Sequence, residues 1–138
     1  MSHGTGRPAA SLVVGAVVAG VEGIALLAYA GYIAVQVARL GITGPAEVSS
    51  PIAVTLEITI FGLLGAGLAL AARGLWRARR WARSMLLVGQ FLALVVGVPL
   101  AGAEGGVERG AGIALVVLAI AGIVAAFWPT TTAAVADN

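Results

Sequence analysis

Four long apolar runs constrain this chain more than any other feature of its sequence. The first, from Ala9 to Val37, contains Glu22 as its only charged residue. As a helix it would be more than about 40 Å long, which exceeds the roughly 30 Å hydrocarbon core of a bilayer. The second run is rich in Ile, Thr and Val, yet an isolated strand could not satisfy its backbone hydrogen bonds in lipid. We therefore expect helices throughout.

The predicted fold class is all-α: a four-transmembrane-helix bundle with short loops, forming a single membrane domain over residues 1–138. Ser49 or Ser50 can cap the second helix, with Pro51 in its first turn. The expected helices cover about residues 9–39, 51–72, 84–101 and 111–128, with a basic loop at 73–83 and a polar tail at 129–138.

The composition supports membrane insertion and excludes several kinds of chemistry. Only 10% of the residues are charged, whereas soluble domains contain about 25%. There is no cysteine, so disulfides and thiolate metal sites are excluded, and the single histidine, His3, lies in a Gly-rich start. We expect neither a metal nor a cofactor. The chain also lacks the Ser–His pair and polar lining that an enzyme of this kind would need, so no catalytic residue is assigned.

A basic stretch between the second and third runs sets the expected orientation. It holds five of the eight arginines, together with two tryptophans. Short loops rich in arginine stay in the cytoplasm, and tryptophan prefers the headgroup layer. We expect cytoplasmic N- and C-termini in the cell membrane, and an anchor to anionic headgroups rather than a nucleic-acid site. The predicted anchor consists of Arg73, Trp76, Arg77, Arg79, Arg80, Trp81, Arg83 and, after the fourth run, Trp128.

Small residues recur at a spacing of four and favour close helix packing in lipid. They are Gly15, Ala19 and Gly23 in the first run; Gly62, Ala66 and Leu70, or Gly65 and Ala69, in the second; Gly97 and Ala101 in the third; and Gly122 and Ala126 in the fourth. They indicate a tight bundle but no particular helix pairing.

Glu22 and Glu57 are the candidate functional residues, because a carboxyl group within a bilayer is costly and normally faces the protein interior. Counting from the helix midpoints puts Glu22 level with Gln90. The same count puts Glu57 level with Tyr29. We therefore expect two polar layers inside the bundle, Glu22 with Gln90 and Glu57 with Tyr29 and Tyr32.

The spacing within the first run relates these layers to one another. Glu22, Tyr29 and Gln36 are seven residues apart, so they share one helix face. Three roles stay open for the polar residues. They could hold helices together through interhelical hydrogen bonds, form a proton or cation site, or contact a partner subunit.

The segment from Val14 to Gly31, with Glu22 flanked by small residues, resembles the first helix of the small multidrug-resistance transporters. That resemblance implies a proton-coupled exporter. The chain departs from that family because it has a second glutamate and lacks the Tyr- and Trp-containing substrate helix expected third in that family. The stretch from Trp76 to Arg83 and the Ala/Val-rich runs also resemble small four-helix membrane proteins of high-GC actinobacteria, a resemblance that implies no activity.

Two functions follow from these patterns. The first is a non-enzymatic accessory or scaffold subunit with a membrane-protein partner. The alternative is a small proton-coupled transporter of cationic or lipophilic compounds, acting as a homodimer and centred on Glu22.

Overall fold

The computed structural model of the chain describes residues 10–42, 50–129 and 131, and its regular structure there is all-helical. The four helices are α1 (Ala10–Leu40), α2 (Pro51–Trp76), α3 (Arg80–Ala101) and α4 (Gly106–Phe127). Each is long and apolar enough to cross a membrane, as predicted. The predicted His3 tail and most of the polar tail at 129–138 lie outside the described residues.

Local sequence signals explain where α1 ends and α2 begins. α1 stops before Gly41, whose φ of +72° is a left-handed conformation that glycine adopts at little cost. Ser50 caps α2: its Oγ accepts a hydrogen bond from the backbone N–H of Ala53 over 3.1 Å, and Pro51 occupies the first turn. Of the two serines expected to cap this helix, Ser50 does so.

The predicted basic loop at 73–83 is too long, because α2 continues to Trp76 and α3 already begins at Arg80. Arginine, alanine and leucine are good helix formers, and Arg73 lies in the last turn of α2, where it interacts favourably with the helix dipole. Only Arg77, Ala78 and Arg79 remain in the turn. Ala78 has a φ of 51°, and the N–H of Arg79 donates to the carbonyl of Gly74 over 2.9 Å.

The predicted turn before the fourth helix is also too long. α4 begins at Gly106 rather than near residue 111, so the turn between α3 and α4 covers only residues 102–105. Glu108 lies in the first turn of α4, where a carboxylate is favoured by the positive end of the helix dipole.

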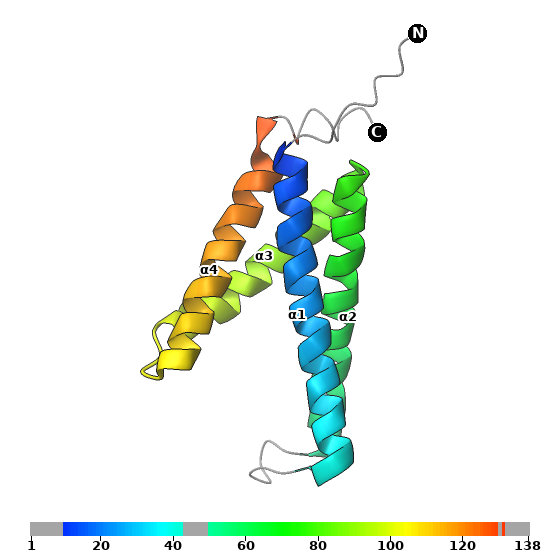
Figure 1. The fold of residues 1–138 in the computed structure, drawn as a ribbon, viewed down its shortest axis with the longest axis vertical. Helices are drawn as coiled ribbons and strands as arrows, with labels where there is room; N and C mark the ends of the chain where they lie inside the picture. Colours follow the sequence, from blue (N-terminus) through cyan, green and yellow to red (C-terminus); the bar gives the residue numbers. More distant parts are fainter. Residues whose placement is uncertain (1–9, 43–49, 130, 132–138) are drawn as a thin grey trace.

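The helices form two hairpins that meet at one end and diverge at the other (Figure 1). α1 packs along α2, and α3 packs against α4, whereas α1 and α3 touch little. α1 begins and α4 ends at the same end of the molecule as the turn between α2 and α3. At the opposite end, the α1–α2 hairpin extends well past the tip of the α3–α4 hairpin.

The buried core lies toward the end where the hairpins meet. Among its leucines, Leu75 of α2 and Leu86 of α3 are the most deeply buried, at 1% and 0% exposure. The rest of the core cluster consists of Leu12, Ala16, Ala19, Leu68, Ala82 and Ala126. Most large apolar side chains of the helices instead face outward, which is the arrangement expected of helices surrounded by lipid.

Glycine allows the two helices of each hairpin to approach closely. A Cβ atom at position 23 would lie 2.8 Å from the backbone nitrogen of Ala69 and 2.9 Å from the carbonyl oxygen of Gly65. At the crossing of α3 and α4, a Cβ atom at Gly112 would collide with the backbone of Leu100 and Ala101. The predicted stripe of Gly15, Ala19 and Gly23 is buried. Of the two stripes proposed for α2, only the one with Gly65 forms such a contact, since Gly62 has open space around it.

We expect Gly23→Ala to lower the free energy of unfolding by about 1–3 kcal/mol, because the new methyl group must push α2 away from α1. The matched control is Gly31→Ala, where a Cβ atom would meet nothing within 4 Å. That control should be neutral or up to about 1 kcal/mol stabilising, since alanine favours a helix over glycine. Thermal unfolding in detergent, followed by circular dichroism, measures both; equal melting temperatures would contradict the close contact.

Candidate functional site

Glu22 of α1 and Gln90 of α3 form a buried pair between the two hairpins. The side chain of Glu22 is 6% exposed and that of Gln90 is fully buried. Gln90 Nε2 donates a hydrogen bond to Glu22 Oε2 over 2.7 Å. The predicted pairing of these two residues is therefore confirmed.

Gly122 of α4 makes room for this pair. A Cβ atom at that position would lie 2.6 Å from Cδ of Gln90 and 2.9 Å from its Oε1. Three helices thus meet at this hydrogen bond: α1 and α3 supply the two side chains, and Gly122 of α4 leaves the space that Gln90 occupies. The sequence stripe of Gly122 and Ala126 indicated close packing there, but it did not show that a glutamine was the group being accommodated.

Two oxygen atoms of the pair have no hydrogen-bond partner among the described residues. These are Oε1 of Glu22 and Oε1 of Gln90, both buried. Leaving a buried polar atom unpaired costs about 1–3 kcal/mol, and more for a charged group. The site therefore offers hydrogen-bond acceptors that the described protein does not itself use.

A cavity of about 130 Å³ opens beside Glu22, and all four helices contribute to its walls. Apart from Glu22, its lining is apolar: Leu26, Phe61, Leu64, Leu68, Gly89, Leu92, Ala93, Val96 and Leu115. An apolar cavity of about 150 Å³ can hold a benzene molecule. The cavity thus combines an apolar volume suited to a small ring with one carboxyl group. Nothing in the sequence pattern indicates this cavity, because its walls come from residues far apart in the chain.

The second expected pair is also present, but it is not inside the bundle. Tyr29 donates through its hydroxyl to Oε1 of Glu57 over 3.3 Å, and its ring packs edge-on against Phe61 with 5.1 Å between centroids. Tyr29 is 45% exposed and Tyr32 is 60% exposed. Tyr32 accepts a hydrogen bond from Gln36 Nε2 over 2.7 Å. The second polar layer therefore lies on the surface of the α1–α2 hairpin.

The divergence of the hairpins explains why Tyr29 and Glu57 are exposed. Tyr29 and Glu57 belong to the α1–α2 hairpin, which extends away from α3 and α4, and among the described residues the pair is exposed rather than enclosed by those helices. Glu57 precedes Trp76 by 19 residues. That interval corresponds to about 28 Å of helix, close to the thickness of the hydrocarbon core. If Trp76 lies at one interface, Glu57 therefore reaches the other.

The predicted anchor residues gather at the end of the molecule where the hairpins meet. Arg73 and Trp76 belong to the last turn of α2, and the remaining residues follow in the turn, in the start of α3 and just after α4. The guanidinium carbon of Arg83 lies 5.2 Å from the centroid of the Phe127 ring, a cation–π contact between α3 and α4.

The donor set at Glu22 suits a hydrogen-bond donor better than a metal ion. Within the described part of the chain, no three His, Cys, Asp or Glu side chains come together as a metal site would need. Calcium and magnesium take six or more oxygen ligands, whereas this pair supplies two free oxygens. The chemistry available here is acceptance of a hydrogen bond, or of a proton, by a carboxyl group in an apolar wall.

No protein family, curated protein or solved structure matches this chain. The resemblances noted in the sequence therefore gain no support from comparison. Any functional proposal has to stand on the geometry of the site.

We expect Gln90→Leu to destabilise the protein by about 1–3 kcal/mol, because it leaves the Glu22 carboxyl group buried without its donor. The double variant Glu22→Leu/Gln90→Leu should recover most of this loss, since two apolar groups need no partner. Gln36→Leu, which removes an exposed hydrogen bond, is the control and should change little. Thermal unfolding of the four proteins in one detergent measures this; a double variant no more stable than Gln90→Leu would contradict it.

Proposed function

We propose that this chain is a multi-pass protein of the cell membrane, with its termini and the turn between α2 and α3 in the cytoplasm. Four helices of membrane-spanning length support the first part. The concentration of arginines at one end supports the second, because arginine-rich short segments stay on the cytoplasmic side.

We infer that Glu22 binds the ammonium group of a small hydrophobic amine, with the apolar part of that amine in the adjoining cavity. The observation that carries this inference is the unpartnered Oε1 of Glu22, on a side chain that also lines the apolar cavity. An ammonium group would supply both the missing hydrogen bond and a compensating positive charge. The size of the cavity, about 130 Å³, selects a ligand of roughly one ring.

Proton coupling follows from the same group. With the site empty, a proton on the carboxyl group removes the cost of an isolated charge in an apolar wall. When an ammonium ion binds, that proton leaves to water and the carboxylate pairs with the cation. Proton and amine thus compete for one carboxyl group, which is the basis of a proton-coupled carrier.

A purely structural pair accounts for less of this geometry. Holding α1 to α3 requires only that Glu22 accept a bond from Gln90, which a neutral side chain would do without the cost of a carboxyl group. A structural role also gives no use to the cavity or to the free oxygen. For these reasons we favour the carrier function over a purely structural role in holding α1 to α3.

An accessory subunit is the second candidate, favoured by the exposed α1–α2 hairpin beyond the tip of α3–α4. Tyr29 and Tyr32 of α1 are exposed, and tyrosine is enriched at protein–protein contacts. A stoichiometric membrane-protein partner in gentle-detergent purifications from the native host, lost on substitution of Tyr32 by alanine, would favour this second function.

We expect Glu22→Gln to weaken binding of benzylammonium at least tenfold while leaving the fold intact. The amide can still accept the bond from Gln90 but cannot pair with a cation, and a loss of about 1.4 kcal/mol corresponds to a factor of ten. Isothermal titration of the purified protein in detergent measures the affinity. In proteoliposomes, benzylammonium should release protons from wild type and not from Glu22→Gln.

The matched control is Glu57→Gln, which removes a carboxyl group from the exposed pair and should bind benzylammonium as wild type does. Benzyl alcohol, a neutral molecule of similar shape, should bind wild type and Glu22→Gln alike. The proposal fails if wild type does not bind benzylammonium, or if both glutamate variants bind it equally well.

The orientation can be tested because the chain contains no cysteine. Single cysteines at Ala78, between α2 and α3, and at Ala103, between α3 and α4, should differ in access to a membrane-impermeant maleimide. We expect Ala103→Cys to react in intact cells and Ala78→Cys to react only after permeabilisation. The reverse pattern would invert the proposed topology.

A further inference from the structure

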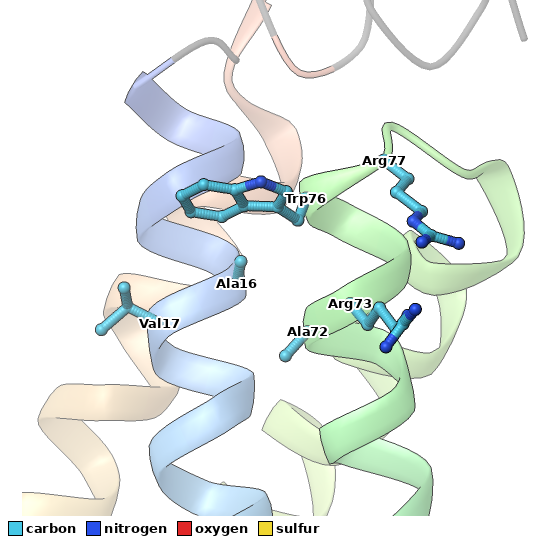
Figure 2. Close-up of a pocket in the computed structure, with 6 residues that line it drawn as sticks. All are labelled: Ala16, Val17, Ala72, Arg73, Trp76 and Arg77. Atoms are coloured by element: carbon cyan, nitrogen blue, oxygen red, sulfur yellow. The ribbon is translucent and has the colours of Figure 1, made fainter. Parts of the chain in front are cut away.

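A groove of about 450 Å³ runs between α1 and α2 beside the turn that joins α2 to α3. Its lining consists of Ala16, Val17, Ala72, Arg73, Trp76 and Arg77 (Figure 2). Ala16 and Ala72 are small, so they leave a shallow channel between the helices, and the indole of Trp76 extends across it toward α1. Its volume falls within the range of ligand sites, about 300–1,000 Å³.

Two arginines stand at the edge of this groove. Arg73 and Arg77 are one helical turn apart, and their guanidinium groups lie on the same side of α2 in Figure 2. They also line a second hollow, of about 220 Å³, together with Leu70, Gly74, Arg79 and Trp81. Arg73 and Arg77 therefore stand between two hollows, one on each side of α2.

These arginines have no carboxylate partner in the part of the chain that the structure describes. Both are exposed, and Arg79 in the turn adds a third positive charge to the same cluster. Planar guanidinium groups bind phosphate oxygens through paired hydrogen bonds. The cluster therefore matches an anion with several oxygens, such as a phosphate, coming from outside the chain.

The groove combines this anion site with an apolar channel and an indole ring. Tryptophan favours the headgroup layer, and the apolar channel below it faces the region occupied by acyl chains if α1 and α2 span the bilayer. Free phosphate would use the arginines but not the channel. A nucleic acid could not enter an apolar channel that faces the acyl chains. A phospholipid uses the arginines, the indole and the channel together.

We propose that this groove is a binding site for an anionic phospholipid. Its phosphate lies between Arg73 and Arg77, and one acyl chain follows the channel over Ala16, Val17 and Ala72. This site is separate from the Glu22 cavity, because the two have no lining residue in common and their nearest lining residues on α2, Leu68 and Ala72, lie about one helical turn apart. The proposal does not depend on the carrier function.

The test is native mass spectrometry of the purified chain, released from detergent containing equal amounts of phosphatidylglycerol and phosphatidylcholine. Wild type should retain phosphatidylglycerol at least fivefold over phosphatidylcholine. Arg73→Gln/Arg77→Gln should lose this preference. Arg39→Gln/Arg109→Gln removes the same charge from the opposite end of the molecule and should keep it.

The channel is tested separately with Val17→Trp, which fills it from an exposed position of α1. Val21→Trp, also exposed but one turn farther from the arginines, is its control. We expect only Val17→Trp to reduce retention of phosphatidylglycerol, by about the same factor as the double arginine variant.

Each other outcome overturns the proposal. Equal losses in the two double arginine variants would mean attraction by net charge alone. No loss in Val17→Trp would leave a headgroup contact without a groove. Full displacement of the lipid by millimolar inorganic phosphate would identify a free-phosphate site instead.

Discussion

The contact between α1 and α2 at Gly23 and Gly65 governs much of the rest of the structure. With no hydrophobic drive between helices in lipid, close backbone approach is a main source of their association. Successive residues of a helix are rotated by about 100°, so pinning Gly23 against α2 turns the adjacent Glu22 away from it. Glu22 thereby faces α3 and meets Gln90. A glycine contact in one hairpin thus orients the carboxyl group that joins it to the other.

The arrangement of the two hairpins places three polar groups at different positions along the molecule. Arginines and tryptophans occupy the end where the hairpins meet. The Glu22–Gln90 pair lies farther along the molecule and is buried, beside a cavity to which all four helices contribute. Beyond it the hairpins diverge, and Tyr29 and Glu57 bond to each other on an exposed face. If the helices span a bilayer, the first group meets the headgroups and the last meets the opposite interface, whereas Glu22 and Gln90 are buried between the hairpins.

The Glu22 cavity and the groove at Arg73 and Arg77 have opposite chemistries at different depths. The cavity offers one acidic group in an apolar wall, which suits a small cation. The groove offers two cations at an open surface, which suits a lipid anion. A lipid in the groove would contact both helices of the α1–α2 hairpin, on which Glu22 depends for its position.

The sequence by itself determined the helical class, the basic end and the depth at which Glu22 and Gln90 meet. These follow from hydropathy and from rise per residue, which are properties of each segment alone. The prediction that Tyr29 and Glu57 pair is confirmed, but the prediction that they lie inside the bundle is wrong. The predicted basic loop was also too long. Only the tertiary structure decided how far the hairpins diverge, and hence the cavity and the exposed tyrosines. That angle depends on contacts between the hairpins, such as Gly89 of α3 against Leu68 of α2 and Gly15 of α1 against Leu86 of α3, where a missing side chain sets how close two helices come.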